Sequence, residues 1–391
     1  MNEVIQREPS TDVVITTVAG QVTATHYSAS PEYDAMVLSL LRQSARSGNA
    51  DSLAKLGAMH ACGDGVPKKY SVARALLRRA ADKGQPLALY NLGVMYAQGY
   101  GIDVNPEVAF NCYAKAAQAG SLDGLNNLGV CYQNGFGCVR SLQLAYEKFH
   151  DAAERGHAIA TSNCGYMKEL GLGTNLDEEE AIRFYRSAAG RGCVEAAYNL
   201  GRLHIFTKTF YNDFTLGRES LHKAAKMGSG YAYNLLGCIE YKGFKVKRDY
   251  EQARQLFLQA ERLGNAAALN NLAWLYQHGY GVPMDLDKAV QYYTQSAALG
   301  YSSAQCNLGY LYFHGLGVEK DLAKAFELFR RALDAENTTA MFNLALLHLD
   351  PDSGYHDPAR AASLLKKCAL AGFAEARDLL EELRSEEAGR A

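Results

Sequence analysis

The sequence predicts an all-α protein, a solenoid (superhelix) of about nine helix-turn-helix repeats of 36 residues with capping helices. Three observations support this fold class: a small residue recurs every 36 positions, a leucine precedes it in nearly every copy, and a glycine turn separates two helix-length apolar patterns. A fixed period of this length is typical of repeats that stack to bury one continuous core. The small residues are Gly57, Gly93, Gly129, Gly165, Gly201, Gly237, Ala273, Gly309 and Ala345.

The first helix of a repeat is clearest at residues 86–98, where Leu92 and Met95 form one apolar stripe. The stripe recurs one period later as Leu128 and Cys131. A large residue beside a small one lets two helices approach closely, so this stripe is expected to face the core. Leucine precedes the small residue in eight of nine repeats, at Leu56, Leu92, Leu128, Leu200, Leu236, Leu272, Leu308 and Leu344, and Cys164 stands in the other.

The Gly-Tyr-Gly turn at residues 99–101 follows this helix and could be taken for a phosphate-binding loop. A dinucleotide-binding loop needs a preceding β-strand and a third glycine that opens a helix, and this segment has neither. The turn also recurs throughout the chain, whereas such a loop would occur once. We therefore predict that Gly99 and Gly101 end the helix and turn the chain, and that Pro106 begins the next helix.

The second helix of each repeat carries a small residue and, four positions later, a large apolar one, which places both on one helix face. The small residue is Ala at 73, 109, 145, 181, 253, 289, 325 and 361 and Gly217 in repeat five, and the large residues are Leu77, Tyr113, Phe149, Tyr185, Leu221, Phe257, Tyr293, Phe329 and Leu365. A glycine then ends the helix, as a left-handed C-terminal cap requires. These glycines are Gly84, Gly120, Gly156, Gly192, Gly228, Gly264, Gly300 and Gly372.

The two ends of the array are expected to differ from its middle. Residues 31–48 match only a second helix and predict an N-terminal capping half-repeat, followed by nine repeats over 49–372. Residues 373–391 are highly charged and predict a capping helix and tail, since a terminal helix must face water on its outer side. Residues 1–30 are β-branched and polar, which favours a flexible extension over a strand docked on the array or on a partner.

The landmarks "NLGVMYAQGYG" and "VAFNCYAKAAQAG" resemble the Sel-one-like repeat family, short relatives of tetratricopeptide repeats. The resemblance covers residues 31 to about 380. It implies a right-handed superhelix of antiparallel helix pairs that holds other proteins, with activities supplied by those partners or by attached domains. Repeat five, "LHIFTKTFYNDFTLG", and repeat nine, "LHLDPDSGYHDPARAA", depart from the family pattern, so their turns are expected to have other shapes.

Composition indicates an ordinary soluble chain, with 48% hydrophobic and 21% charged residues and a formal net charge of −2. No bulk charge points to nucleic acid, and no apolar run is long enough for membrane insertion. The N-terminus lacks the features of a secretory or transit peptide, so a cytoplasmic protein is expected. The nine cysteines occupy nine different phases of the repeat, which argues against a disulfide ladder and favours reduced, buried thiols.

No catalytic motif is present, so we expect a protein that is not an enzyme and uses no metal or cofactor. His60, His204 and His348 share one phase, and His278 and His314 share another, but residues one repeat apart are not expected to form a metal site. The acidic run at 177–180 opens a helix, where carboxylates are stabilising. For the basic segment "KGFKVKR" at 242–248, a solvated loop is favoured over contact with phosphate or an acidic partner.

The strongest candidate for a binding site is the face that the first helices turn away from their partners. Helical geometry assigns to this first-helix face the positions six, three and two before the small residue and one, four and five after it. Asparagine can bond an extended peptide, and aromatic rings serve as anchors. The face carries Asn91, Asn127, Asn163, Asn199, Asn271, Asn307 and Asn343, with Tyr90, Tyr166, Tyr198, Tyr231, Tyr241, Trp274, Tyr310, Phe313 and Phe342.

Two alternatives accompany this site. The asparagines could instead bond the backbone of a neighbouring helix and serve only as scaffold. In repeat five, Phe206, Phe210 and Tyr211 replace a glycine turn; they are expected to contact a partner or the N-terminal segment, or to fold back and plug the gap.

We interpret the chain as a non-enzymatic adaptor that binds other proteins or peptides through the first-helix face. A structural subunit of a large assembly is the main alternative, using the second helices and repeats five and nine. A hydrolase or metallochaperone, as reported for some disulfide-laddered relatives of this repeat, is disfavoured because the ladder is missing. The sequence leaves the oligomeric state open.

Overall fold

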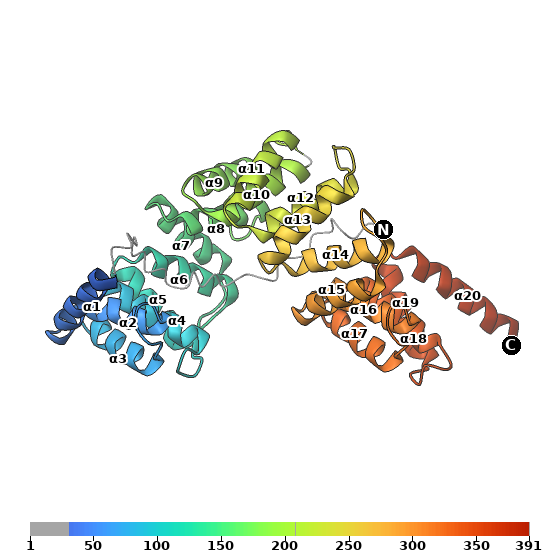
Figure 1. Cartoon of the computed structure of the whole chain (residues 1–391), viewed down its shortest axis with the longest axis horizontal. Coiled ribbons are helices and arrows are strands. Elements are labelled where there is room, and N and C mark those ends of the chain that lie inside the picture. Colours follow the sequence, from blue (N-terminus) through green and yellow to red (C-terminus); the bar gives the residue numbers. More distant parts are fainter. Residues whose placement is uncertain (1–30, 208, 391) are drawn as a thin grey trace. The chain divides into compact units, whose positions relative to one another are not determined.

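The computed structural model describes residues 31–207 and 209–390, and the predicted N-terminal extension at 1–30 lies outside this range. The described residues form twenty α-helices and no strand, in two compact units that divide between Asn212 and Asp213 (Figure 1). The first unit holds α1(Pro31–Arg46), α2(Ala50–Cys62), α3(Tyr70–Ala81), α4(Pro86–Gln98), α5(Pro106–Gln118), α6(Leu122–Asn134), α7(Leu142–Glu154), α8(Ala158–Leu170), α9(Glu178–Gly190) and α10(Val194–Phe206). The second holds α11(Phe214–Lys226), α12(Gly230–Lys242), α13(Tyr250–Arg262), α14(Ala266–His278), α15(Leu286–Ala298), α16(Ser302–His314), α17(Leu322–Asp334), α18(Thr338–Leu349), α19(Pro358–Leu370) and α20(Ala374–Arg390).

Within each unit the helices stack in chain order as the predicted solenoid. The even-numbered helices α2 to α18 are the first helices of the nine repeats, and the odd-numbered helices α3 to α19 are the second helices. First helices of neighbouring repeats contact each other directly, as α2 does α4 and as α14 does α16. The first helices therefore lie on the more crowded, inner side of each stack. Helices α1 and α20 cap the ends of the series.

The turn after each regular first helix has the predicted chemistry. Gly99 has left-handed backbone (φ 71°), and its N–H bonds the carbonyl of Met95, which closes the end of α4. Pro106 is the first residue of α5, and the Asn105 side chain accepts a bond from Val108 N. The second glycine of the turn packs against the start of the preceding second helix, as Gly281 does on Tyr250, where a Cβ would come within 2.7 Å.

In the repeats that lie within one unit, the core joins the small residue of the first helix to the large residue of the second. A Cβ added at Gly93 would lie 2.6 Å from the ring of Tyr113, so the ring can occupy its present position, the glycine seat, only because residue 93 has no side chain. The same contact recurs between Gly129 and Phe149. Tyr185, Tyr293, Phe149, Phe257 and Phe329 are the largest fully buried side chains. The predicted close approach of the two helices is confirmed in these repeats.

Repeats five and nine have turns of their own, as the sequence predicts. In repeat five the chain leaves α10 at Thr207 in an extended conformation, where regular repeats place a left-handed glycine. In repeat nine it leaves α18 at Asp350, also extended, and the ring of Tyr355 stacks on Phe326 at 4.3 Å between centroids.

All nine cysteines are unpaired thiols. Six of them are buried, Cys62 is exposed, and Cys112 and Cys138 are half-buried. The expected absence of a disulfide ladder is confirmed, while the expected burial holds for two thirds of the set.

Candidate partner-binding surface

The asparagines of the first-helix face are all partly buried, and several bond the neighbouring first helix. Asn163 Nδ2 donates to Asn126 Oδ1 at 3.0 Å, and Asn307 Nδ2 donates to Asn270 Oδ1 at 2.9 Å. Each bond joins residues 37 positions apart and holds two first helices in register. The donor groups of these amides therefore hold neighbouring first helices together, as the scaffold alternative expected, but their acceptors are side-chain oxygens and not the helix backbone.

Other asparagines of the row follow related geometries. Asn271 Nδ2 donates to Asn234 Oδ1 at 2.9 Å and approaches Cys238 Sγ at 3.6 Å. Asn343 Nδ2 approaches Cys306 Sγ at 3.5 Å, and Asn91 bonds the Leu87 carbonyl of its own helix at 2.9 Å. Asn127 accepts a bond from Asn126 at 3.3 Å, and Asn199 is partly buried.

In the first unit, the aromatic members of the face lie low in the surface. Tyr90 is only 7% exposed and packs at a tilt on Tyr113, with 6.1 Å between ring centroids. Burial raises the pKa of Tyr90 to about 12. Tyr166 and Tyr198 are partly buried. None of the three predicted aromatic side chains of this unit is fully exposed.

A partly buried ion pair on the same face was missed by sequence reasoning. Arg202 Nη2 donates to both carboxylate oxygens of Glu169, at 2.6 and 2.7 Å, and Tyr185 OH donates to Glu169 at 2.9 Å. Arg202 follows its small residue by one position and Glu169 follows its own by four, so the two lie 33 residues apart. That spacing is the signal that could have revealed the pair.

The second unit presents a cluster of connected rings, which we call the aromatic cluster: Tyr241, Tyr250, Trp274, His278 and Tyr280. Trp274 Nε1 donates to Tyr241 OH at 2.8 Å, again across 33 residues. The rings of Tyr250 and Tyr280 stack at 5.0 Å, and Tyr241 lies 5.6 Å from Tyr250. The ring of His278 lies 3.9 Å from that of Trp274. Four of these rings are partly buried and His278 is exposed, so packing holds the cluster in place while part of it remains accessible to solvent.

More rings continue the face along the second unit. Tyr310 is 40% exposed and lies 4.3 Å from the ring of His314. Phe313 and Phe342 are partly buried, and Phe342 packs on Phe373 at 5.0 Å. Tyr231, at the start of α12, is 56% exposed. The structure thus brings Tyr241 and Trp274 into direct contact and leaves Tyr231 and Tyr310 projecting.

The turn of repeat five is tied to the preceding repeat. Thr207 and Thr209 donate to one oxygen of Glu178 at 2.7 and 2.6 Å, and Tyr211 OH donates to Glu179 at 2.7 Å. These bonds reach the start of α9, the place where regular turns pack their second glycine. Phe206 and Tyr211 are partly buried, whereas Phe210 is 96% exposed. The turn is therefore folded back onto the start of α9, as one alternative expected, but it leaves the ring of Phe210 exposed to solvent.

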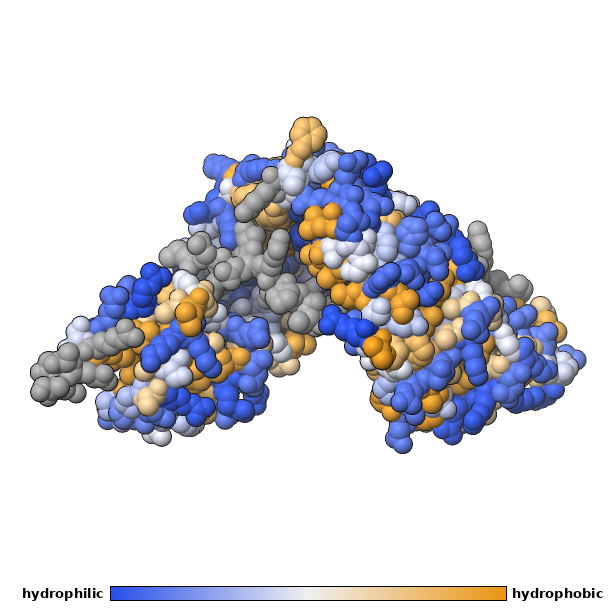
Figure 2. Space-filling model, turned by 180° about the vertical axis from the view of Figure 1, so that it is seen from behind, coloured by the Kyte–Doolittle hydropathy of each residue, from blue (hydrophilic) through white to orange (hydrophobic). Residues whose placement is uncertain are grey.

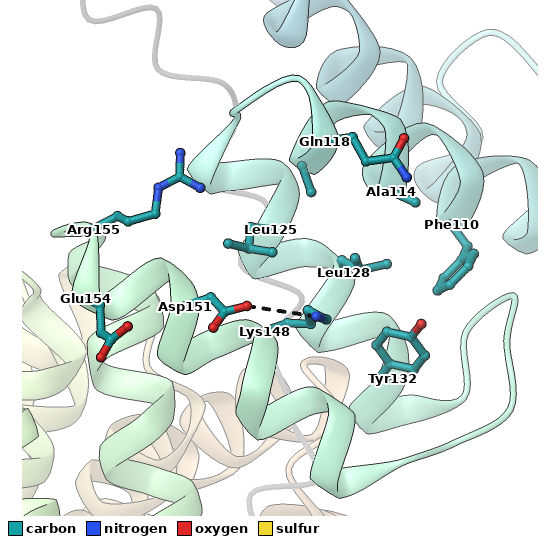
Figure 3. Close-up of a pocket in the computed structure, with 11 residues that line it drawn as sticks. Phe110, Ala114, Gln118, Leu125, Leu128, Tyr132, Lys148, Asp151, Glu154 and Arg155 are labelled. Carbon is teal, nitrogen blue, oxygen red and sulfur yellow. Dashed lines mark ion pairs between the residues drawn. The ribbon is translucent and has the colours of Figure 1, made fainter.

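A pocket of about 600 Å³ opens between α5, α6 and α7, on the side of the second helices (Figure 3). Phe110, Leu125 and Leu128 form part of its apolar lining, and the Lys148–Asp151 ion pair, at 3.8 Å, stands on its rim. The small side chain of Ala114 lines this pocket. The other second helices carry larger side chains at the same phase: Arg78, His150, Arg186, His222, Leu258, Thr294, Arg330 and Lys366.

The histidines that share one phase have a structural role in the turns. Nδ1 of His60, His204 and His348 lies 3.0, 2.9 and 2.6 Å from a turn carbonyl seven residues later, so this nitrogen donates and the imidazole stabilises the turn.

No group of three or more metal-ligating side chains is found among residues 31–207 and 209–390. Within that same range, no helix has the length and apolar character needed to cross a membrane. On the side that Figure 2 shows, apolar patches alternate with hydrophilic side chains.

Comparisons with known proteins support the repeat assignment. The family model described as Sel1 repeat matches eight segments, residues 50–85, 86–121, 122–157, 158–193, 230–265, 266–301, 302–337 and 338–373. The ninth expected copy, with the irregular turn, lies between these segments and folds as α10 and α11. No match was found among curated proteins.

Two solved structures are similar to this chain over long stretches. One is c5321, a protective antigen present in uropathogenic Escherichia coli strains, displaying an SLR fold; it is 32% identical with a TM-score of 0.56, over 88% of this chain and 73% of that one. The other is a Sel1 repeat protein from Oxalobacter formigenes, 27% identical with a TM-score of 0.58, over 64% of this chain and all of that one.

Proposed function

This chain belongs to the Sel1 repeat family, and we propose that it is a non-enzymatic adaptor that binds protein partners through its first-helix face. Solenoids of this kind are typical protein-interaction scaffolds, since stacked repeats create an extended concave binding surface. Nine unpaired thiols fit a reducing compartment, and we place the adaptor in the cytoplasm.

The aromatic side chains of the second unit are the observation that carries this proposal. Trp274 and Tyr241 are fixed by a mutual hydrogen bond, and Tyr310 is 40% exposed beyond them. Tryptophan and tyrosine in fixed positions lose little conformational entropy on binding, which is why they dominate binding hot spots. The asparagines hold the helices that present these rings, so we assign partner contact to the rings first and to the amides second.

A pull-down with the full chain tests the proposal. We expect Trp274→Ala with Tyr310→Ala to lose most of the partners captured by the wild type. Tyr292→Ala is the matched control, because Tyr292 is a partly buried ring on a second helix, stacked on Tyr276 at 5.8 Å. All variants are compared at equal helical content by circular dichroism. If the double variant captures the same partners as wild type, the first-helix face of the second unit is not the binding site.

The turn of repeat five is proposed as an additional contact. Phe210 is 96% exposed on a turn that three hydroxyl–carboxylate bonds hold in place, so it needs little ordering on binding. Phe210→Ala should weaken capture of at least one partner in the same pull-down. Hydrogen exchange of this turn that is identical with and without partner would leave it only the role of a plug.

A further inference from the structure

The turn between α12 and α13 carries the densest positive charge that the sequence singled out. This basic loop, residues 242–248, contains Lys242, Lys245, Lys247 and Arg248, and the last three are exposed. In the part of the chain that the structure describes, no acidic side chain lies within ion-pair distance of Lys242, Lys247 or Arg248. Lys247 and Arg248 are also exposed, so the charge of these two groups is available to an outside partner.

The backbone of the basic loop is strained at a lysine. Lys245 has φ 56°, in the left-handed region that disfavours residues with a Cβ. Six other turns place a glycine at this phase, at Gly65, Gly101, Gly137, Gly173, Gly281 and Gly317. The strained conformation sets Lys245 Nζ over the rings of Phe214 and Phe244, at 5.6 and 5.8 Å from their centroids. Strain of this kind concentrates at functional sites, where the surrounding structure compensates for it.

The basic loop borders the aromatic cluster in the same unit. The guanidinium carbon of Arg248 lies 5.8 Å from the ring of Tyr250, and Arg248 Nη1 donates to Tyr250 OH at 3.2 Å. Tyr250 in turn stacks on Tyr280. The cations of the basic loop and the partly buried rings of the aromatic cluster therefore adjoin one another.

We propose that this surface binds an acidic protein segment that carries an aromatic anchor. Carboxylates would pair with Lys247 and Arg248, and the anchor ring would pack on Trp274 and Tyr280. A nucleic acid fits less well, because its phosphates need an extended basic surface, whereas this chain has a net charge of −2 and the basic loop spans only seven residues. The inference deepens the proposed adaptor function and rests on it by naming the chemistry of one partner.

The test measures fluorescence anisotropy of a dye-labelled glutamate-rich peptide with one central tryptophan, titrated with the full chain. Wild type should bind this peptide more tightly in low salt than in high salt, and more tightly than the same peptide without the tryptophan. Lys247→Glu with Arg248→Glu should weaken binding about tenfold or more, and Lys247→Gln with Arg248→Gln should give a smaller loss.

A matched charge reversal controls for nonspecific attraction. Lys68→Glu with Lys69→Glu changes the turn of repeat one, where Lys68 Nζ lies 5.1 Å from the Tyr70 ring in the same register as Arg248 and Tyr250. This control should bind the peptide within about twofold of wild type. Equal losses in both reversed variants, no binding by wild type, or tighter binding of a single-stranded oligo(dT) would overturn the proposal.

The pull-down separates this inference from the adaptor function itself. If the Lys247→Glu, Arg248→Glu variant keeps every partner that Trp274→Ala with Tyr310→Ala loses, the acidic-partner inference fails and the adaptor function stands. If both variants keep every partner although the peptide binds to wild type and not to the loop variant, the loop recognises acidic segments and the proposed use of the first-helix face fails.

Discussion

Two residues other than glycine have left-handed backbone in turns where the other repeats place a glycine. Glu336, two residues beyond the last residue of α17, has φ 58°, at the phase where the other second helices are followed by a left-handed glycine. Lys245 does the same in the basic loop. A Cβ in this region costs roughly 1 kcal/mol, so each residue lowers the stability of its own turn.

Replacing these two residues by glycine should separate structure from function. We expect Glu336→Gly and Lys245→Gly each to raise the free energy of unfolding by about 0.5–1 kcal/mol in urea denaturation, because the strain is relieved. Only Lys245→Gly should also weaken binding of the acidic peptide, because it removes a positive charge from the basic loop. A loss of stability in Lys245→Gly would show that its contacts with Phe214 and Phe244 outweigh the strain.

Thiol reactivity is a second prediction at the residue scale. Burial raises the pKa of Cys131, Cys164 and Cys238 to about 12, so at pH 8 roughly one thiol in ten thousand is the reactive thiolate. Cys62 is exposed and should react first with a thiol reagent in the native protein. In denaturant all nine cysteines should react, and fast native reaction at a buried position would contradict this packing.

Helix pairs depend on the glycine seat described above, and a pair of glycines tests it. Gly93→Ala places a Cβ 2.6 Å from the Tyr113 ring, so we expect it to lower the free energy of unfolding by about 1–3 kcal/mol. The lower end is favoured, because repeat seven accommodates Ala273 beside Tyr293. Gly190→Ala is the control: a Cβ there meets no atom within 4 Å, so it should stabilise α9 by about 0.5–1 kcal/mol. Equal effects of the two changes on the free energy of unfolding would show that the contact between residue 93 and Tyr113 does not require a glycine.

The turn of repeat five depends on a carboxylate of the previous repeat. Glu178→Ala removes the acceptor shared by Thr207 and Thr209, so the amides of residues 209–212 should exchange about tenfold faster. Glu107→Ala removes an acidic residue from the first turn of α5 and should leave this exchange unchanged. Unaltered exchange in Glu178→Ala would mean that these hydroxyl bonds do not hold the turn.

The sequence predicts the helix pairs and turns well, because their signals are local or repeat every 36 residues. It predicts the candidate face less well. A helical wheel drawn for one helix pair leaves Tyr90 and the asparagines exposed, whereas the next first helix covers them in the stack. The sequence alone marks the basic loop, but the contact that joins it to the aromatic cluster became visible only when turns of neighbouring repeats were placed together, since Tyr250 and Tyr280 belong to different repeats.

On the scale of the whole molecule, the chain divides into two compact units inside the repeat whose turn lacks glycine. Stability of a solenoid is approximately a sum over repeats and their nearest-neighbour interfaces, so a weakened link between repeats can separate cooperative blocks. Trp274 is the only tryptophan and lies in the second unit, so its fluorescence reports that unit alone, while circular dichroism reports both.

We therefore expect the two units to respond separately to core truncation. Leu77 in the first unit and Leu365 in the second are both fully buried at the same phase, so each Leu→Ala change should cost about 2–5 kcal/mol. Leu77→Ala should shift part of the circular dichroism transition in urea and leave the Trp274 fluorescence midpoint in place. Leu365→Ala should shift the fluorescence midpoint. If Leu77→Ala moves the fluorescence midpoint as far as Leu365→Ala does, the nine repeats unfold as one cooperative block, and the irregular turn of repeat five does not interrupt the stack.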